Sequence, residues 1–91
     1  MKVLNAKVYG KVQGVFFRKY TYDFARSIKL VGIVKNLDDG AVFIRVSGTD
    51  EKLKEFKKYL QNGSPDSRVD KIDYSWEDSS VEYSNFEIEY S

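Results

Sequence analysis

The stretch Gln13-Gly14-Val15-Phe16-Phe17-Arg18-Lys19 decides the fold, because it joins a strand pattern to a helix pattern through a loop that contains glycine. The helix opens with two cations, and the first acid after them is Asp23, more than one turn later. Helix N-termini carry a partial positive charge and favour acids by about 0.3–1 kcal/mol per charge. The reversed charge pattern indicates that the helix end, the loop amides and Arg18 all point at one bound anion.

The backbone of this loop suits an anion. No proline interrupts residues 12–18, so every N–H group can donate, and Gly14 permits the positive φ that lets successive amides converge. We expect Phe16 and Phe17 to serve mostly as packing, one under the loop and one against the sheet. A plainer interpretation stays open, in which the loop is only a tight connection and Arg18 is a surface arginine paired with a nearby acid.

Length and composition predict a single domain over residues 1–91. Hydrophobic residues make up 42% and charged residues 32% of the chain, which is typical of a globular protein and excludes a disordered one. The net charge is only +1, so no overall field attracts nucleic acid or an anionic membrane. A local basic patch can still bind a small anion, so the expected partner is a small molecule.

Two missing residue types narrow the chemistry further. The sequence has no cysteine and no histidine, which excludes thiol nucleophiles, disulfides, imidazole bases and metal sites built on either side chain. Any catalysis must therefore use arginine, lysine, asparagine, carboxylates, hydroxyls and backbone amides. No apolar run is long enough to span a bilayer and no signal peptide is evident, so we expect a cytoplasmic protein.

Hydrophobic periodicity predicts the order βαββαβ with a final short strand. The expected elements are a strand through 4–9, a loop over 10–17, a helix over 18–30, strands over 31–36 and 41–47 joined by a turn at 37–40, a helix over 50–61 capped by Thr49 or Asp50, a strand over 69–76, a polar turn over 77–82, and a strand over 86–90. This order predicts an α+β ferredoxin-like sandwich, with an antiparallel sheet and both helices on one face. The first strand is expected inside the sheet, and aromatic residues of the last strands are expected to pack on it: Tyr74, Trp76, Tyr83, Phe86 and Tyr90.

The turn after the second strand carries the other candidate residue. Asn36 ends that strand, where an asparagine can simply form the turn or can hold a water through its amide. If both strands end at one edge of the sheet, Asn36 and Arg18 can face one pocket. Asp38 and Asp39 invite a Mg²⁺ proposal, but Asp-Asp-Gly is more typical of a turn, so no metal is expected.

These two motifs together resemble the acylphosphatase signature, a Val-Gln-Gly-Val-x-Phe-Arg loop followed by a Lys-Asn-x-x-x-Gly turn. The resemblance covers nearly the whole chain and is most specific over residues 10–18 and at Gly32, Lys35, Asn36 and Gly40. One departure is Ile33, where the family usually has an aromatic residue after the glycine.

The resemblance implies a metal-free, cofactor-free enzyme that hydrolyses acyl phosphates to carboxylate and phosphate. It implies that Arg18 and Asn36 are catalytic and that the phosphate-binding loop consists of Gln13, Gly14, Val15, Phe16, Phe17 and Arg18. Lys19 is expected to be a solvated neighbour, and the protein a monomer. Two alternatives stay open: an anion-sensing domain of the same fold without turnover, and an RNA-binding ferredoxin-like module, although residues 41–47 lack the aromatic RNA-binding motif.

Overall fold

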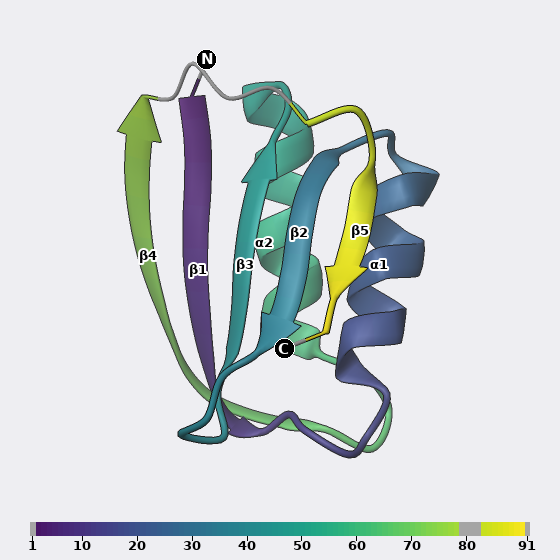
Figure 1. The fold of residues 1–91 in the computed structure, drawn as a ribbon, viewed down its shortest axis with the longest axis vertical. Helices are drawn as coiled ribbons and strands as arrows, with labels where there is room; N and C mark the ends of the chain where they lie inside the picture. Colours follow the sequence, from purple (N-terminus) through teal and green to yellow (C-terminus); the bar gives the residue numbers. More distant parts are fainter. Residues whose placement is uncertain (1, 79–82, 91) are drawn as a thin grey trace.

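The computed structural model describes residues 2–78 and 83–90. Two helices and five strands follow each other as β1 (Lys2–Lys11), α1 (Phe17–Ser27), β2 (Val31–Asn36), β3 (Val42–Ser47), α2 (Asp50–Asn62), β4 (Arg68–Asp78) and β5 (Phe86–Glu89). Both helices cover the same face of the sheet (Figure 1). The predicted α+β ferredoxin-like fold is thereby confirmed.

The strands lie in the order β4-β1-β3-β2-β5, so β1 lies inside the sheet as predicted. The first four strands pair antiparallel, whereas β5 pairs parallel with β2, which makes the sheet mixed rather than wholly antiparallel. The reason is geometric. The last residues of β4 and the first residues of β2 lie at the same end of the sheet (Figure 1). A strand that starts from this end beside β2 must therefore run in the same direction as β2.

The core lies between the helices and the sheet. Alternate residues of β1 and β3 face it, and the hydrophobic face of α2 covers them, as the periodicity predicts. Fully buried members from these three elements are Leu4, Ala6, Val8, Val42, Ile44, Val46, Leu53, Phe56 and Leu60. Phe86 of β5 is also buried, and its ring centroid lies 6.3 Å from that of Phe56.

The helix ends follow local signals. The side chain of Thr49 accepts a hydrogen bond of 3.3 Å from the Lys52 N–H, which confirms the predicted cap of α2. Helix α1 ends at Ser27, earlier than predicted, because Lys29 has a left-handed backbone with φ 61° that the helix cannot contain. No helix in the described part of the chain is long and apolar enough to cross a membrane.

Three expectations about the last strands need correction. β4 continues to Asp78, beyond the predicted end, because it pairs with the full length of β1; the rest of the predicted turn, residues 79–82, lies outside the described residues. Trp76 and Tyr90 were predicted to pack on the sheet, but they are 49% and 74% exposed. Both lie near the margin of the sheet, on an edge strand and just past the end of another, where neighbours cover a ring less completely.

Candidate active site

The loop between β1 and α1 turns through two left-handed residues. Gly14 has φ 75° and Phe16 has φ 61°. A left-handed conformation costs a residue with a side chain about 1–2 kcal/mol, so the loop holds Phe16 against a local preference. The Phe16 side chain is 71% exposed, and the prediction that it packs in the core is wrong, because the left-handed turn directs only the next residue, Phe17, inward to 2% exposure.

Two side chains anchor the loop to distant segments. The Gln13 side-chain amide donates to the carbonyl oxygens of Leu37 and Ala41, at 2.8 and 2.9 Å, which ties the loop to the turn between β2 and β3. The buried Ser64 hydroxyl, just after α2, donates to the Val15 carbonyl at 3.1 Å. The side chain of Gln13 and the carbonyl of Val15 are therefore occupied by bonds that hold the loop against neighbouring segments.

The N-terminus of α1 presents unpaired donors. No side chain caps this end of the helix, and no acid lies in its first turn. The Tyr20 N–H donates to the Phe16 carbonyl at 3.0 Å, but within the described residues the N–H groups of residues 14–19 have no partner. The first N–H groups of a helix seek an acceptor, and an anion suits them because the helix dipole adds positive potential.

Asn36 reaches the same place from the sheet. Val34 is buried on the helix-covered face of β2, and the two-residue period of a strand puts Asn36 on that face as well. Its side-chain oxygen is buried, and no described residue donates to it. A buried acceptor without a donor costs free energy unless water or a ligand supplies one, so Asn36 is ready to accept a hydrogen bond from a small molecule.

These groups line one cavity of about 360 Å³, together with side chains from the end of the sheet. Its lining residues are Val12, Gly14, Phe16, Phe17, Arg18, Lys19, Asn36, Ile88 and Tyr90. The loop before α1, the end of β2 and the end of β5 all lie at one edge of the sheet (Figure 1). The structure therefore brings the predicted pair, Arg18 and Asn36, to one cavity, whereas Gln13 and Val15 of the predicted loop do not line it.

The charges around the cavity leave Arg18 available. Within residues 2–78 and 83–90 no carboxylate pairs with Arg18, and Asp23 forms an ion pair of 3.4 Å with Lys19 instead. The Arg18 guanidinium lies over the ring of Tyr90, with 5.1 Å between its central carbon and the ring centroid. Such stacking fixes a guanidinium without neutralising it. The alternative in which Arg18 is bound by an acid therefore finds no support in the described residues.

One aspartate of the turn, Asp39, has structural partners. Asp39 accepts a hydrogen bond of 3.0 Å from the Ala41 N–H and pairs with Lys7 at 2.8 Å. The hydrogen bond from Lys7, followed by that from Ala41, lowers the pKa of the Asp39 carboxyl. This agrees with the interpretation of Asp-Asp-Gly as a turn. The described part of the chain contains no group of three or more acidic, histidine or cysteine side chains that could hold a metal ion.

Comparison with known proteins places this geometry in a family. The family model described as acylphosphatase matches residues 4–88. Human Acylphosphatase-2 is 46% identical over 93 residues, which cover 99% of this chain and 94% of the human protein. The chain belongs to the acylphosphatase family. The family match and the human relative also support acylphosphatase activity for the chain.

Solved acylphosphatase structures share the fold. The crystal structure of acylphosphatase from Bacillus subtilis superposes with a TM-score of 0.95 at 39% identity and covers 99% of this chain and 100% of that one. The structure of an acylphosphatase from Coxiella burnetii superposes with a TM-score of 0.90 at 31% identity, covering 97% of this chain and 92% of that one. The acylphosphatase fold therefore extends over the whole described chain.

Sequence reasoning missed the residues that β5 brings to the cavity. In the parallel pairing of β2 with β5, Gly32 lies beside Phe86 and Val34 beside Ile88. Continuing that register by two residues places Tyr90 beside Asn36, and both residues line the cavity. The signal was present in the spacing, but using it requires knowing that β5 runs parallel to β2.

Proposed function

We propose that this protein hydrolyses acyl phosphates to a carboxylate and inorganic phosphate, with Arg18 and Asn36 as its catalytic residues. One observation carries the proposal: Arg18 and Asn36 line one cavity at the N-terminus of α1, where backbone N–H groups have no partner among the described residues. Within the same residues, no carboxylate pairs with Arg18 and no donor reaches the buried side-chain oxygen of Asn36. The phosphate-binding loop is proposed to be residues 13–18. Gly14, Phe16, Phe17 and Arg18 line the cavity, and Gln13 and Val15 hold the loop in shape.

The phosphoryl group would bind at the N-terminus of α1. The backbone N–H groups of the loop and the first turn can donate to its oxygens, and the guanidinium of Arg18 can grip two of them at once. The transition state of phosphoryl transfer is loose and spreads negative charge over the oxygens that do not react. Donors fixed before the reaction stabilise that charge without having to reorganise, so this arrangement would speed the reaction as well as bind the substrate.

Asn36 would position the attacking water. Its side-chain oxygen can accept one O–H, which directs the water oxygen toward phosphorus. The water oxygen then bonds to phosphorus while the bond between phosphorus and the carboxyl oxygen breaks, and the electron pair leaves with the carboxylate. One water proton stays on the new P–OH group and the other passes to a phosphoryl oxygen. This sequence needs no histidine, because a carboxylate is already a good leaving group.

Three finer features belong to the same proposal. The groups around the phosphoryl site supply positive potential and hydrogen-bond donors themselves, so catalysis is proposed to proceed without a metal ion. The substrate is proposed to be a small-molecule acyl phosphate, and the protein is proposed to act as a monomer with no nucleic-acid or membrane partner. The cytoplasmic location stays a prediction from the sequence.

The test is hydrolysis of benzoyl phosphate in the presence of a chelator. We expect the wild type to turn over, Arg18→Gln to lose about 10²–10⁴ in kcat/KM, and Asn36→Ala to lose kcat while inorganic phosphate inhibits it as before. Matched controls are Arg26→Gln near the other end of α1 and Asn62→Ala at the end of α2, both exposed and outside the cavity. Phosphate binding without hydrolysis by the wild type would favour the anion-sensing alternative. Weaker phosphate inhibition of Asn36→Ala at unchanged kcat would contradict the role given to Asn36.

A further inference from the structure

The cavity has an apolar part that the phosphoryl chemistry leaves unused. Arg18, Asn36 and the N–H groups of the loop form its polar part, and Phe16, Ile88 and Tyr90 add hydrophobic side chains. A cavity of about 360 Å³ is in the range of small-molecule sites, and it is larger than one phosphoryl group requires. The remaining volume lies where the rest of the substrate must be accommodated.

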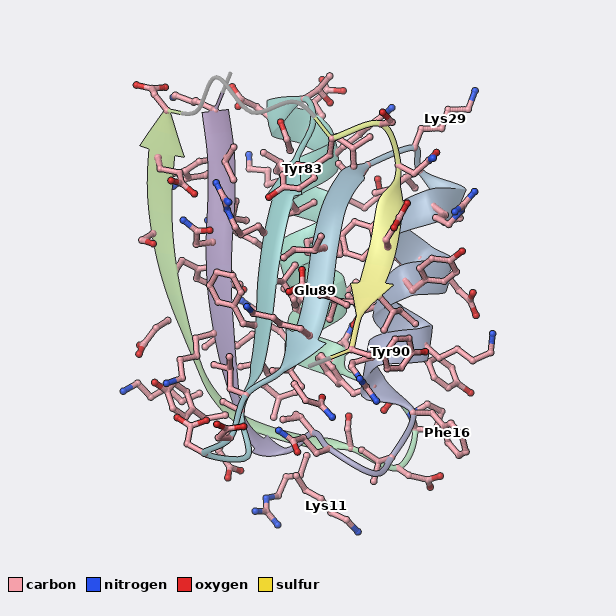
Figure 2. The ribbon with its side chains drawn as sticks, viewed as in Figure 1. Lys11, Phe16, Lys29, Tyr83, Glu89 and Tyr90 are labelled. Atoms are coloured by element: carbon pink, nitrogen blue, oxygen red, sulfur yellow. The ribbon has the colours of Figure 1, made fainter. Side chains whose placement is uncertain are left out.

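Exposed aromatic rings concentrate at this cavity. Four large hydrophobic side chains of the described residues are exposed, and two of them, Phe16 at 71% and Tyr90 at 74%, line it. Figure 2 shows them at the same lower corner of the molecule, one from the loop before α1 and one just past β5. Exposed rings that converge on a cavity from two segments are typical of a binding surface, because each gains when a ligand covers it.

The fold fixes the backbone of Phe16 and the ring of Tyr90. Phe16 lies in the left-handed turn that directs it outward, and the bond from Ser64 to the carbonyl of Val15 fixes the residue before it. Tyr90 follows a strand paired with β2, and its ring stacks on the guanidinium of Arg18. A residue whose backbone or ring is already positioned loses less conformational entropy when a ligand binds, which favours recognition of a flat apolar group.

We propose that Phe16 and Tyr90 form an acyl-binding mouth that favours acyl phosphates with flat, apolar acyl groups over those with short ones. The inference rests on the proposed function, because it assigns the leaving carboxylate to the apolar part of the cavity while the phosphoryl group occupies the polar part. The rings contact a portion of the substrate that does not change in the reaction. Their contribution is therefore equal in the ground state and the transition state, and it affects KM rather than kcat.

The experiment compares kcat/KM for benzoyl phosphate and acetyl phosphate in the wild type and in single variants. Phe16→Ala and Tyr90→Ala are each expected to lower the benzoyl-to-acetyl ratio by about three- to tenfold, through a higher KM for benzoyl phosphate. Tyr90→Phe keeps the ring and should keep the wild-type ratio. Trp76→Ala removes an exposed ring that lies outside the cavity, so both substrates should behave as with the wild type.

The ratio separates the two uses of Tyr90. If its ring only orients Arg18, Tyr90→Ala lowers kcat/KM for both substrates equally, and the ratio stays the same. A wild type that hydrolyses both substrates, with a ratio that neither Phe16→Ala nor Tyr90→Ala changes, overturns the acyl-binding mouth and leaves the proposed function intact. A wild type that hydrolyses neither substrate overturns the proposed function, and with it the acyl-binding mouth, which depends on that function.

Discussion

The arginine at the end of the sheet that holds the cavity and the arginine on the face of the sheet without helices have opposite surroundings. On the uncovered face, Arg45 forms an ion pair with Glu77, and Lys35 forms one with Glu89 at 3.7 Å. Asn5 also donates to Glu77 at 3.1 Å. At the cavity, Arg18 has no carboxylate partner among the described residues.

This difference shows which side chains remain free to bind a ligand. The carboxylate of Glu77 offsets the charge of Arg45, so this arginine serves the scaffold, although its Nε has no partner among the described residues. Arg18 lies over a ring and keeps its charge and its donors for a ligand. The two amides differ less: no described residue donates to the side-chain oxygen of either Asn5 or Asn36, but the Asn5 nitrogen donates to a carboxylate of the neighbouring strand, and only Asn36 lines the cavity.

The largest expected effect on stability comes from removing the Ser64 hydrogen bond that anchors the loop. Ser64→Ala leaves the buried carbonyl of Val15 without its donor, and it should lower the free energy of unfolding by about 1–3 kcal/mol. The loop also loses its support, so kcat/KM should fall. Chemical denaturation and benzoyl phosphate hydrolysis measure the two effects.

A matched serine serves as the control. Ser47 is as buried as Ser64, and it also donates from its hydroxyl to a backbone carbonyl, that of Lys2, at 3.0 Å. This bond lies at the opposite end of the sheet from the cavity. Ser47→Ala should therefore cost similar stability and leave kcat/KM unchanged. Equal losses of activity in the two variants would remove the distinction between the site and the scaffold.

A smaller effect compares the two arginines by stability alone. A cation at a helix N-terminus opposes the helix dipole, so Arg18→Gln should raise the free energy of unfolding by about 0.3–1 kcal/mol. Arg45→Gln breaks a partly exposed ion pair and should lower it by at most about 1 kcal/mol. Denaturation midpoints at low salt measure both changes. A loss of stability in Arg18→Gln would mean that Arg18 belongs to the scaffold.

The smallest expected effect concerns the loss of stability at acidic pH. The hydrogen bond from Asn5, with the charge of Arg45 as a further cause, lowers the pKa of Glu77 from its usual 4.5. A carboxyl whose pKa is lowered by folding stabilises the protein above its unfolded pKa, and this contribution is lost as the pH falls through the folded pKa. Glu77→Gln should therefore narrow the difference in denaturation midpoint between pH 7 and pH 3. An unchanged difference would show that Glu77 contributes nothing at neutral pH.

Much of the fold could be predicted from the sequence, because alternation and helical spacing are local properties. They place β1 through α2 within a few residues of their observed bounds. The direction of β5 could not be predicted in this way. It depends on where the preceding strand ends in space, and no local pattern records that position.

The candidate site also contains residues that local patterns mark and residues that only long-range contacts reveal. Arg18, Gly14 and Asn36 could be predicted because each violates or marks a local rule: a cation at a helix start, a glycine in a loop, an asparagine at a strand end. The anchoring role of Ser64 and the contribution of Tyr90 depend on contacts between segments far apart in the chain. The exposure of Phe16 follows from a left-handed backbone that phenylalanine rarely adopts, so its residue type predicted the opposite.

The most direct test of the central claim is a titration with inorganic phosphate that follows the amide signals of the protein by NMR. The account predicts that the backbone N–H signals of residues 14–19 and the side-chain amide of Asn36 shift together with one dissociation constant. Signals of the uncovered face, such as those of Arg45, should stay in place, and Arg18→Gln should weaken the binding. Shifts on the uncovered face with a silent loop would contradict the account.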